Sequence, residues 1–141
     1  MILYCDTSSL VKLYIEEAGS AQVRASFNVA DMVATCRVAL PEMFSALTRR
    51  LNSGDVERVA YESLVNAIRS DWPHIIALDF SETDAADLVE RFGLRGFDAV
   101  HLSSALRLAG RSGVALVLSS FDVKLNSAAE SEGLNVLKIC L

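Results

Sequence analysis

Short apolar runs alternate with longer amphipathic segments along this chain of 141 residues. The runs have the length of β-strands and cover residues 2–5, 32–35, 75–78, 114–118 and 136–139. The segments with helical spacing of apolar residues cover residues 10–17, 20–28, 41–51, 56–71, 82–92, 98–108 and 123–131. Strands that alternate with helices form parallel sheets, because a long crossover must return the chain to the same edge. The pattern predicts an α/β fold with a five-stranded parallel sheet covered by helices.

Residues that begin and end helices support these boundaries. Ser81 and Asp84 have the spacing of a capping box, and Pro41 suits the first turn of a helix. Glycines follow four of the predicted helices, at positions 54, 93, 110 and 133.

The composition is typical of one ordinary globular domain, which we expect to span residues 1–141. Hydrophobic residues make up 52% of the chain and charged residues 22%. Charged residues interrupt every apolar run before it reaches the ~18 residues of a membrane helix. The first residues include Asp6 and no basic leader, so we expect a protein of the cytoplasm that does not span a membrane.

The cysteines and histidines indicate no metal site of the zinc type. Cys5, Cys36 and Cys140 lie far apart without a Cys-x-x-Cys pair, and we expect them to be reduced core residues. His74 and His101 have no ligand spacing. We expect hydrogen-bonded structural histidines and assign neither a catalytic role.

Four acids stand where a parallel α/β sheet places its ligands, beyond the carboxyl ends of the strands. Asp6 ends the first predicted strand, Glu42 lies in the opening turn of the helix after the second, and Asp122 follows the fourth. Asp98 opens its own helix and reaches this edge only if the preceding helix lies across the sheet. We expect these four acids to line one site.

Helix geometry directs two of these acids toward the protein body. Residues at i+3, i+4 and i+7 lie nearly above residue i, which aligns Asp98 with Leu102 and Ala105, and Asp122 with Leu125 and Ala129. Glu42 lies above a small, polar strip and should border a crevice. Taken singly, each acid could equally cap a helix or close a turn.

A cluster of four acids requires a cation. Unit charges about 4 Å apart repel by roughly 4 kcal/mol at an effective dielectric constant of about 20. Carboxylate oxygens without His or Cys ligands suit Mg²⁺ or Mn²⁺, which also bind substrate phosphates. The constellation therefore indicates metal-assisted phosphodiester hydrolysis.

The net charge of -5 is unfavourable for an enzyme that binds nucleic acid. If four of the 18 acids are reserved for a metal, the other 14 nearly balance the 13 Lys and Arg residues. Bases that could contact RNA include Lys12, Arg37, Arg49 and Lys124.

Four sequence motifs resemble the PIN-domain ribonucleases, in particular the VapC-type toxins of toxin–antitoxin pairs. They are Ile-Leu-Tyr-Cys-Asp6-Thr-Ser-Ser, Leu40-Pro-Glu42, Arg95-Gly-Phe-Asp98-Ala-Val-His-Leu and Ser119-Ser-Phe-Asp122-Val-Lys-Leu. The resemblance covers essentially the whole chain, and the acids have the order and spacing of the family.

The resemblance implies a three-layer α/β/α sandwich, with residues 1–141 forming one PIN domain. It implies that Asp6 and Asp98 are the principal ligands of one or two Mg²⁺ or Mn²⁺ ions, and that Glu42 and Asp122 complete the catalytic pocket. Ser8 and Ser120 match supporting hydroxyl positions, although Ser120 replaces the more common threonine. It also implies an RNA substrate, a homodimer and a cognate VapB-like antitoxin.

Three other interpretations remain. A receiver-like phosphoacceptor domain would use Asp6, Asp79, Ser119 or Ser120, and Lys138, but it leaves Asp98 and Asp122 without a purpose. A dehalogenase-like phosphatase needs Asp-x-Asp, where this chain has Asp6-Thr-Ser8. A catalytically inert PIN-like binding module does not explain why all four acids are present.

Overall fold

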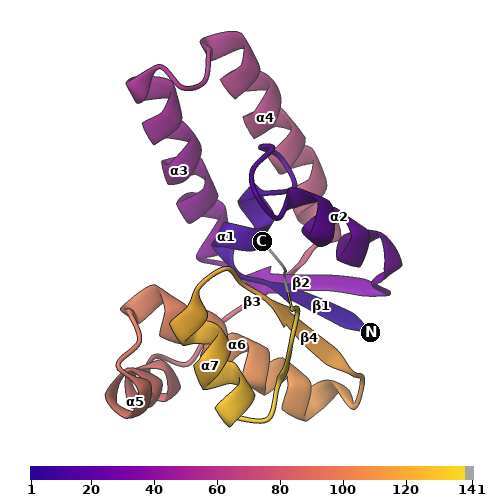
Figure 1. The fold of residues 1–141 in the computed structure, drawn as a ribbon, viewed down its shortest axis with the longest axis vertical. Helices are drawn as coiled ribbons and strands as arrows, with labels where there is room; N and C mark the ends of the chain where they lie inside the picture. The colour runs from indigo at the N-terminus through magenta and orange to yellow at the C-terminus, as the bar shows by residue number, and fades with distance from the viewer. Residues whose placement is uncertain (139–141) are drawn as a thin grey trace.

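The fold is a three-layer α/β/α sandwich, seen in the computed structural model, which describes residues 1–138 (Figure 1). The strands are β1 (Ile2–Cys5), β2 (Met32–Cys36), β3 (Ile76–Leu78), β4 (Leu116–Ser119) and β5 (Asn135–Val136). They form one sheet in the order β3-β2-β1-β4-β5, and every neighbouring pair is parallel. The predicted five-stranded parallel sheet and α/β/α architecture are confirmed.

Helices cover both faces of this sheet (Figure 1). On one face lie α1 (Thr7–Val11), α2 (Ser20–Val29), α3 (Ala39–Ser53) and α4 (Arg58–Asp71), the last followed by the 3₁₀ turn η1 (Trp72–His74). On the other face lie α5 (Glu82–Phe92), α6 (Gly96–Ser112) and α7 (Val123–Ser131).

The two helical layers explain why the central strand is apolar without interruption. Side chains alternate between the faces of a strand, so Ile2 and Tyr4 enter the core beneath α5, α6 and α7. Leu3 and Cys5 enter the second core, beneath α1, α3 and α4. All four side chains are buried, as expected for a parallel strand covered on both sides.

The place of β1 in the sheet determines where a site can form. β1 pairs with β2 on one side and with β4 on the other, so the residues that follow these three strands emerge side by side. The backbone N–H of Asp6 donates to the Ser119 carbonyl at 3.1 Å, so the pairing between β1 and β4 continues to Asp6, just beyond the end of β1. Ligand sites of parallel α/β sheets lie at this edge.

The predicted elements differ from the observed ones mainly at their ends. The first helix, predicted at 10–17, is the short α1, because Asp6 caps it by accepting from the Ser9 N–H. The helix predicted at 98–108 is longer in the structure and contains Gly110, since the chain turns into the left-handed conformation only at Gly113. The strand predicted at 136–139 is the short β5, and Ile139 lies outside the described residues.

Other predictions of structure are confirmed. Ser81 caps α5 by accepting from the Asp84 N–H at 3.2 Å, as the capping-box spacing indicated. Cys5 and Cys36 are buried free thiols, whereas Cys140 lies outside the described residues. Among residues 1–138, no helix combines the length and apolarity needed to cross a membrane.

Replacing Gly19 by alanine tests how the loop before α2 packs against the site. Gly19 has φ +92°, and a Cβ there would lie 2.3 Å from Cε1 of Phe121. We expect Gly19→Ala to lower the free energy of unfolding by about 2–3 kcal/mol, the sum of left-handed strain and overpacking. Chemical denaturation measures this loss.

Gly54→Ala is the matched control, because Gly54 has φ +83° but nothing within 4 Å of its added Cβ. We expect it to lose only the backbone part, about 1 kcal/mol. Equal losses in the two variants would show that the contact with Phe121 contributes nothing.

Candidate functional site: an acidic cleft at the carboxyl edge of the sheet

A cleft of about 680 Å³ opens at the carboxyl edge of the sheet. Asp6, Glu42, Asp98 and Asp122 all line it, so the four acids named from the sequence share one cleft. The cleft is also lined by four bases, Lys12, Arg49, Arg50 and Arg95, and by two further acids, Glu17 and Asp55. Glu17 pairs with both Lys12 and Arg50. A cleft lined by both acids and bases can attract a cation and a polyanion together.

Asp6 is the most buried of the four acids, with 4% of its surface exposed. Both of its carboxylate oxygens accept hydrogen bonds: Oδ1 from the Ser8 hydroxyl at 2.6 Å and the Ser9 N–H at 3.0 Å, and Oδ2 from the Ser120 hydroxyl at 2.5 Å. Burial raises the pKa of Asp6, and the hydrogen bonds from Ser120 and Ser8 oppose that rise. Asp6 is therefore held rigidly in a place that resists its negative charge.

Ser8 and Ser120 reach Asp6 from different parts of the fold. Ser8 lies within α1, and Asp6 is the residue that caps this helix. Ser120 follows β4, and its oxygen also accepts the Asp122 N–H at 3.1 Å. These hydroxyls connect the segment after β1 with the segment after β4.

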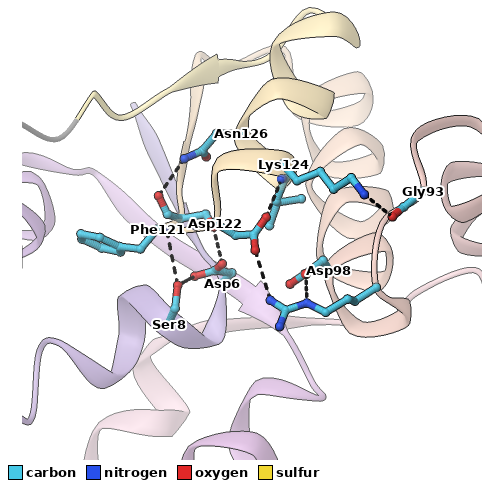
Figure 2. Close-up of polar contacts among 11 residues, drawn as sticks. Asp6, Ser8, Gly93, Asp98, Phe121, Asp122, Lys124 and Asn126 are labelled. Carbon is cyan, nitrogen blue, oxygen red and sulfur yellow. Dashed lines mark hydrogen bonds and ion pairs between the residues drawn. The ribbon is translucent and has the colours of Figure 1, made fainter.

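Asp98 and Asp122 are joined by one guanidinium group. Arg95 Nε lies 2.9 Å from Asp98 Oδ2, and Arg95 Nη2 lies 3.1 Å from Asp122 Oδ2. Figure 2 shows the carboxylates of Asp6, Asp98 and Asp122 gathered in one region. The Arg95 side chain is 79% exposed, so solvent screens both ion pairs.

The capping interpretation holds for Asp122 without excluding a role in the cleft. Its Oδ1 accepts from the Leu125 N–H at 2.8 Å, whereas Oδ2 faces Arg95. Asp98 does not cap α6, which begins after Arg95 without a side-chain cap. Leu102 and Leu125, aligned with these two acids on their helices, are fully buried, as the helical spacing predicted.

Glu42 projects from the first turn of α3 toward α1 and α6. Its Oε1 accepts from the Thr7 hydroxyl at 2.7 Å and lies 3.3 Å from His101 Nε2. Partial burial raises the pKa of Glu42, but the hydrogen bonds from His101 and Thr7 outweigh it, so the pKa is lowered overall. The carboxylate form is therefore favoured at this position.

Sequence reasoning missed four residues that hold these acids in place: Thr7, Ser9, Arg95 and His101. Ser9 contributes a backbone N–H, which no side-chain pattern reveals. His101 is buried and hydrogen-bonded, as predicted, but its contact with Glu42 joins residues 59 positions apart. A signal was available for Arg95, which precedes Asp98 by three residues.

The donor set suits a hard divalent cation, although the acids do not enclose one as they stand. Within the described part of the chain, no three His, Cys, Asp or Glu side chains are close enough together to hold a metal ion. The guanidinium of Arg95 instead provides positive charge between two of the acids. Hard oxygen donors in a shared cleft fit Mg²⁺ or Mn²⁺ once that guanidinium moves.

The residues of the receiver interpretation do not meet in this cleft. Asp79 lies on the surface, where it pairs with Arg37 Nε at 3.2 Å, and it does not line the cleft. Lys138 is exposed and follows β5.

Comparison with known proteins settles the family. The PIN domain family model matches residues 3–131. The chain belongs to the PIN domain family. It is 32% identical over 142 aligned residues to Ribonuclease VapC45 of Mycobacterium tuberculosis (strain CDC 1551 / Oshkosh), a match that covers 96% of this chain and 94% of the relative. The resemblance to VapC-type PIN ribonucleases stated from the sequence is confirmed.

Two solved structures share the fold. PAE2754 from Pyrobaculum aerophilum aligns with a TM-score of 0.67 at 20% identity, over 97% of this chain and 84% of that protein. VapC20 from Mycobacterium tuberculosis, described as a sarcin-ricin loop cleaving toxin, aligns with a TM-score of 0.65 at 19% identity, over 89% of this chain and 94% of that protein. These likenesses confirm the PIN-like α/β/α fold.

The burial of Asp6 makes the stability of the metal-free protein depend on pH. Folding raises the pKa of Asp6. The stability that this shift contributes is therefore fully present below the unfolded pKa of about 3.9, and it is lost as pH rises through the raised value. Asn at position 6 keeps an oxygen for the Ser9 N–H without the charge. In a chelator, we expect the stability of the native protein relative to Asp6→Asn to fall between acid and neutral pH.

Thermal unfolding of both proteins across this pH range measures the difference in their stability. The effects of the other titrating groups largely cancel in this difference, because both proteins contain them. If the stability difference between the native protein and Asp6→Asn stays constant with pH, the charged Asp6 carboxylate does not destabilise the metal-free protein, and the prediction is wrong.

Proposed function

We propose that this protein is a ribonuclease that uses Mg²⁺ or Mn²⁺ to hydrolyse phosphodiester bonds of RNA in the acidic cleft. The observation that carries the proposal is that Asp6, Glu42, Asp98 and Asp122, from four separate segments, line one cleft. Membership of the PIN domain family and the similarity to VapC45 support the same chemistry.

The charges of the cleft support the need for a cation. Asp6 is buried without a basic side chain among its hydrogen-bond partners, and Asp98 and Asp122 share a single arginine. A bound Mg²⁺ or Mn²⁺ would polarise the scissile phosphate and lower the pKa of a water that attacks phosphorus. We propose Asp6 and Asp98 as the principal ligands, with Asp122 and Glu42 completing the set.

The remaining residues orient the ligands and the substrate. Ser8 and Ser120 fix the plane of the Asp6 carboxylate by donating to its two oxygens. The Arg95 guanidinium must leave the aspartates when they bind an ion, and its exposure leaves it room to turn toward an RNA phosphate. Arg49, which lines the cleft from α3, is a second base that could contact an RNA phosphate.

We further propose that the protein is the toxin of a toxin–antitoxin pair and acts in the cytoplasm. Its similarity to VapC45, and its shared fold with the toxin VapC20, support this role. A VapB-like antitoxin would then cover the cleft, and the toxin would form a homodimer. We propose that one PIN domain accounts for residues 1–141.

Removing either principal ligand tests the proposed chemistry. We expect Asp6→Asn and Asp98→Asn each to lower the rate of Mn²⁺-dependent cleavage of single-stranded RNA at least about 100-fold, because a ligand and its charge are lost together. Gel analysis of a labelled RNA pool measures the rate, and circular dichroism verifies the fold. Asp79→Asn, a surface aspartate outside the cleft, is the matched control and should cleave normally.

Cleavage that survives either substitution, or that persists in excess chelator, would refute the metal-dependent mechanism. A folded chain that shows no cleavage and no Mn²⁺ binding would instead indicate a catalytically inert PIN module.

Replacing Arg95 tests whether its guanidinium competes with the metal. We expect Arg95→Gln to bind Mn²⁺ several-fold more tightly than the native protein, because Asp98 and Asp122 no longer lose an ion pair on binding. Isothermal titration without RNA measures this affinity. Arg91→Gln, which breaks an ion pair with Glu132 outside the cleft, should leave the affinity unchanged. Weaker Mn²⁺ binding by Arg95→Gln would contradict the competition.

A further inference from the structure

His101 lies at the centre of a buried hydrogen-bond chain beneath the cleft. It is 2% exposed and follows Asp98 by three residues on α6, so one turn of that helix carries a proposed ligand and this imidazole. Its Nδ1 lies 3.0 Å from the Tyr4 hydroxyl on β1. Its Nε2 lies 3.1 Å from the Thr7 hydroxyl on α1 and 3.3 Å from Glu42 Oε1 on α3.

The hydrogens of this chain can be assigned from donor and acceptor chemistry. The Thr7 hydroxyl has one hydrogen and donates it to the Glu42 carboxylate, which can only accept. Nε2 of His101 faces the Thr7 oxygen and the carboxylate, so it must carry a hydrogen. The Tyr4 hydroxyl can then donate to Nδ1. The imidazole therefore directs its Nε2–H toward Glu42.

The chain fixes a side chain that would otherwise be mobile. Glu42 has three rotatable side-chain bonds and remains 27% exposed at the cleft. Its Oε1 accepts a hydrogen bond from the Thr7 hydroxyl and faces the His101 N–H, whereas no hydrogen bond to Oε2 is found among the described residues. One oxygen is thus anchored and the other left for the cleft.

We infer that His101, supported by Tyr4 and assisted by Thr7, is a positioning residue that holds the Glu42 carboxylate in place for the site's metal ion. This inference rests on the proposed function, because Glu42 acts there as a ligand. Hydrogen bonds to ligating carboxylates commonly change metal affinity or activity by about 10- to 100-fold when they are removed. The role differs from that of a core histidine, whose loss would affect folding alone.

A double-mutant cycle on Mn²⁺ binding separates the two roles. We expect His101→Leu to weaken Mn²⁺ binding to the RNA-free protein by about 10- to 100-fold and to lower kcat without raising KM for RNA. His101→Gln, which restores an N–H donor, should recover most of the affinity. In the Glu42→Ala background, His101→Leu should change the affinity by less than about twofold, the usual limit of additivity.

Thr7→Val keeps the test valid if His101→Leu does not fold. It removes the second donor to Glu42 from a partly exposed position, and we expect the same direction of change with a smaller size. His74→Leu, at an exposed histidine of η1, is the matched control and should bind Mn²⁺ normally.

Two results would overturn the inference. One is the same loss of affinity from His101→Leu with and without the Glu42 carboxylate, which would place the effect elsewhere. The other is unchanged Mn²⁺ binding in folded His101→Leu and Thr7→Val. Both results leave the proposed function intact if Asp6→Asn still abolishes cleavage. A native chain that neither binds Mn²⁺ nor cleaves RNA would reject the two proposals together.

Discussion

The buried carboxylate at the end of the central strand is the constraint on which the rest of the structure depends. Asp6 emerges between the ends of β2 and β4, so the segments that carry Glu42 and Asp122 must lie beside it. It also caps α1, so the same side chain sets the direction of the first helix. Burying this charge is unfavourable without compensation. Ser8, Ser9 and Ser120 supply part of that compensation, and a cation would supply the rest.

The acids of the cleft differ in how firmly their partners hold them. Asp6 and Glu42 are bound by hydroxyls and an imidazole that belong to the packed body of the protein. Asp98 and Asp122 share an arginine that is largely exposed. Asp6 and Glu42 are thus held rigidly, whereas Asp98 and Asp122 can exchange the Arg95 guanidinium for a metal ion. The same release would free a base for the RNA backbone.

Much of this arrangement could be predicted from the sequence because it follows from strand order and helical period. A parallel sheet places residues after neighbouring strands together, which brought Asp6, Glu42 and Asp122 to one edge, and the helical face of Asp98 pointed inward. The predicted start of the first helix was wrong because Asp6, which the pattern assigned only to the end of the strand, also caps α1. The contact between His101 and Glu42 joins two helices far apart in sequence, and periodicity carries no information about such pairs.

Crystals grown with Mn²⁺ and measured at the manganese absorption edge offer the most direct test of a metal bound by the acidic cleft. We expect an anomalous peak in the cleft, bonded to oxygens of both Asp6 and Asp98 at about 2.2 Å, close to the bond length of small divalent ions. The Arg95 guanidinium should then be turned away from Asp98. A cleft without a peak, or an ion bound without Asp6, would contradict the central claim.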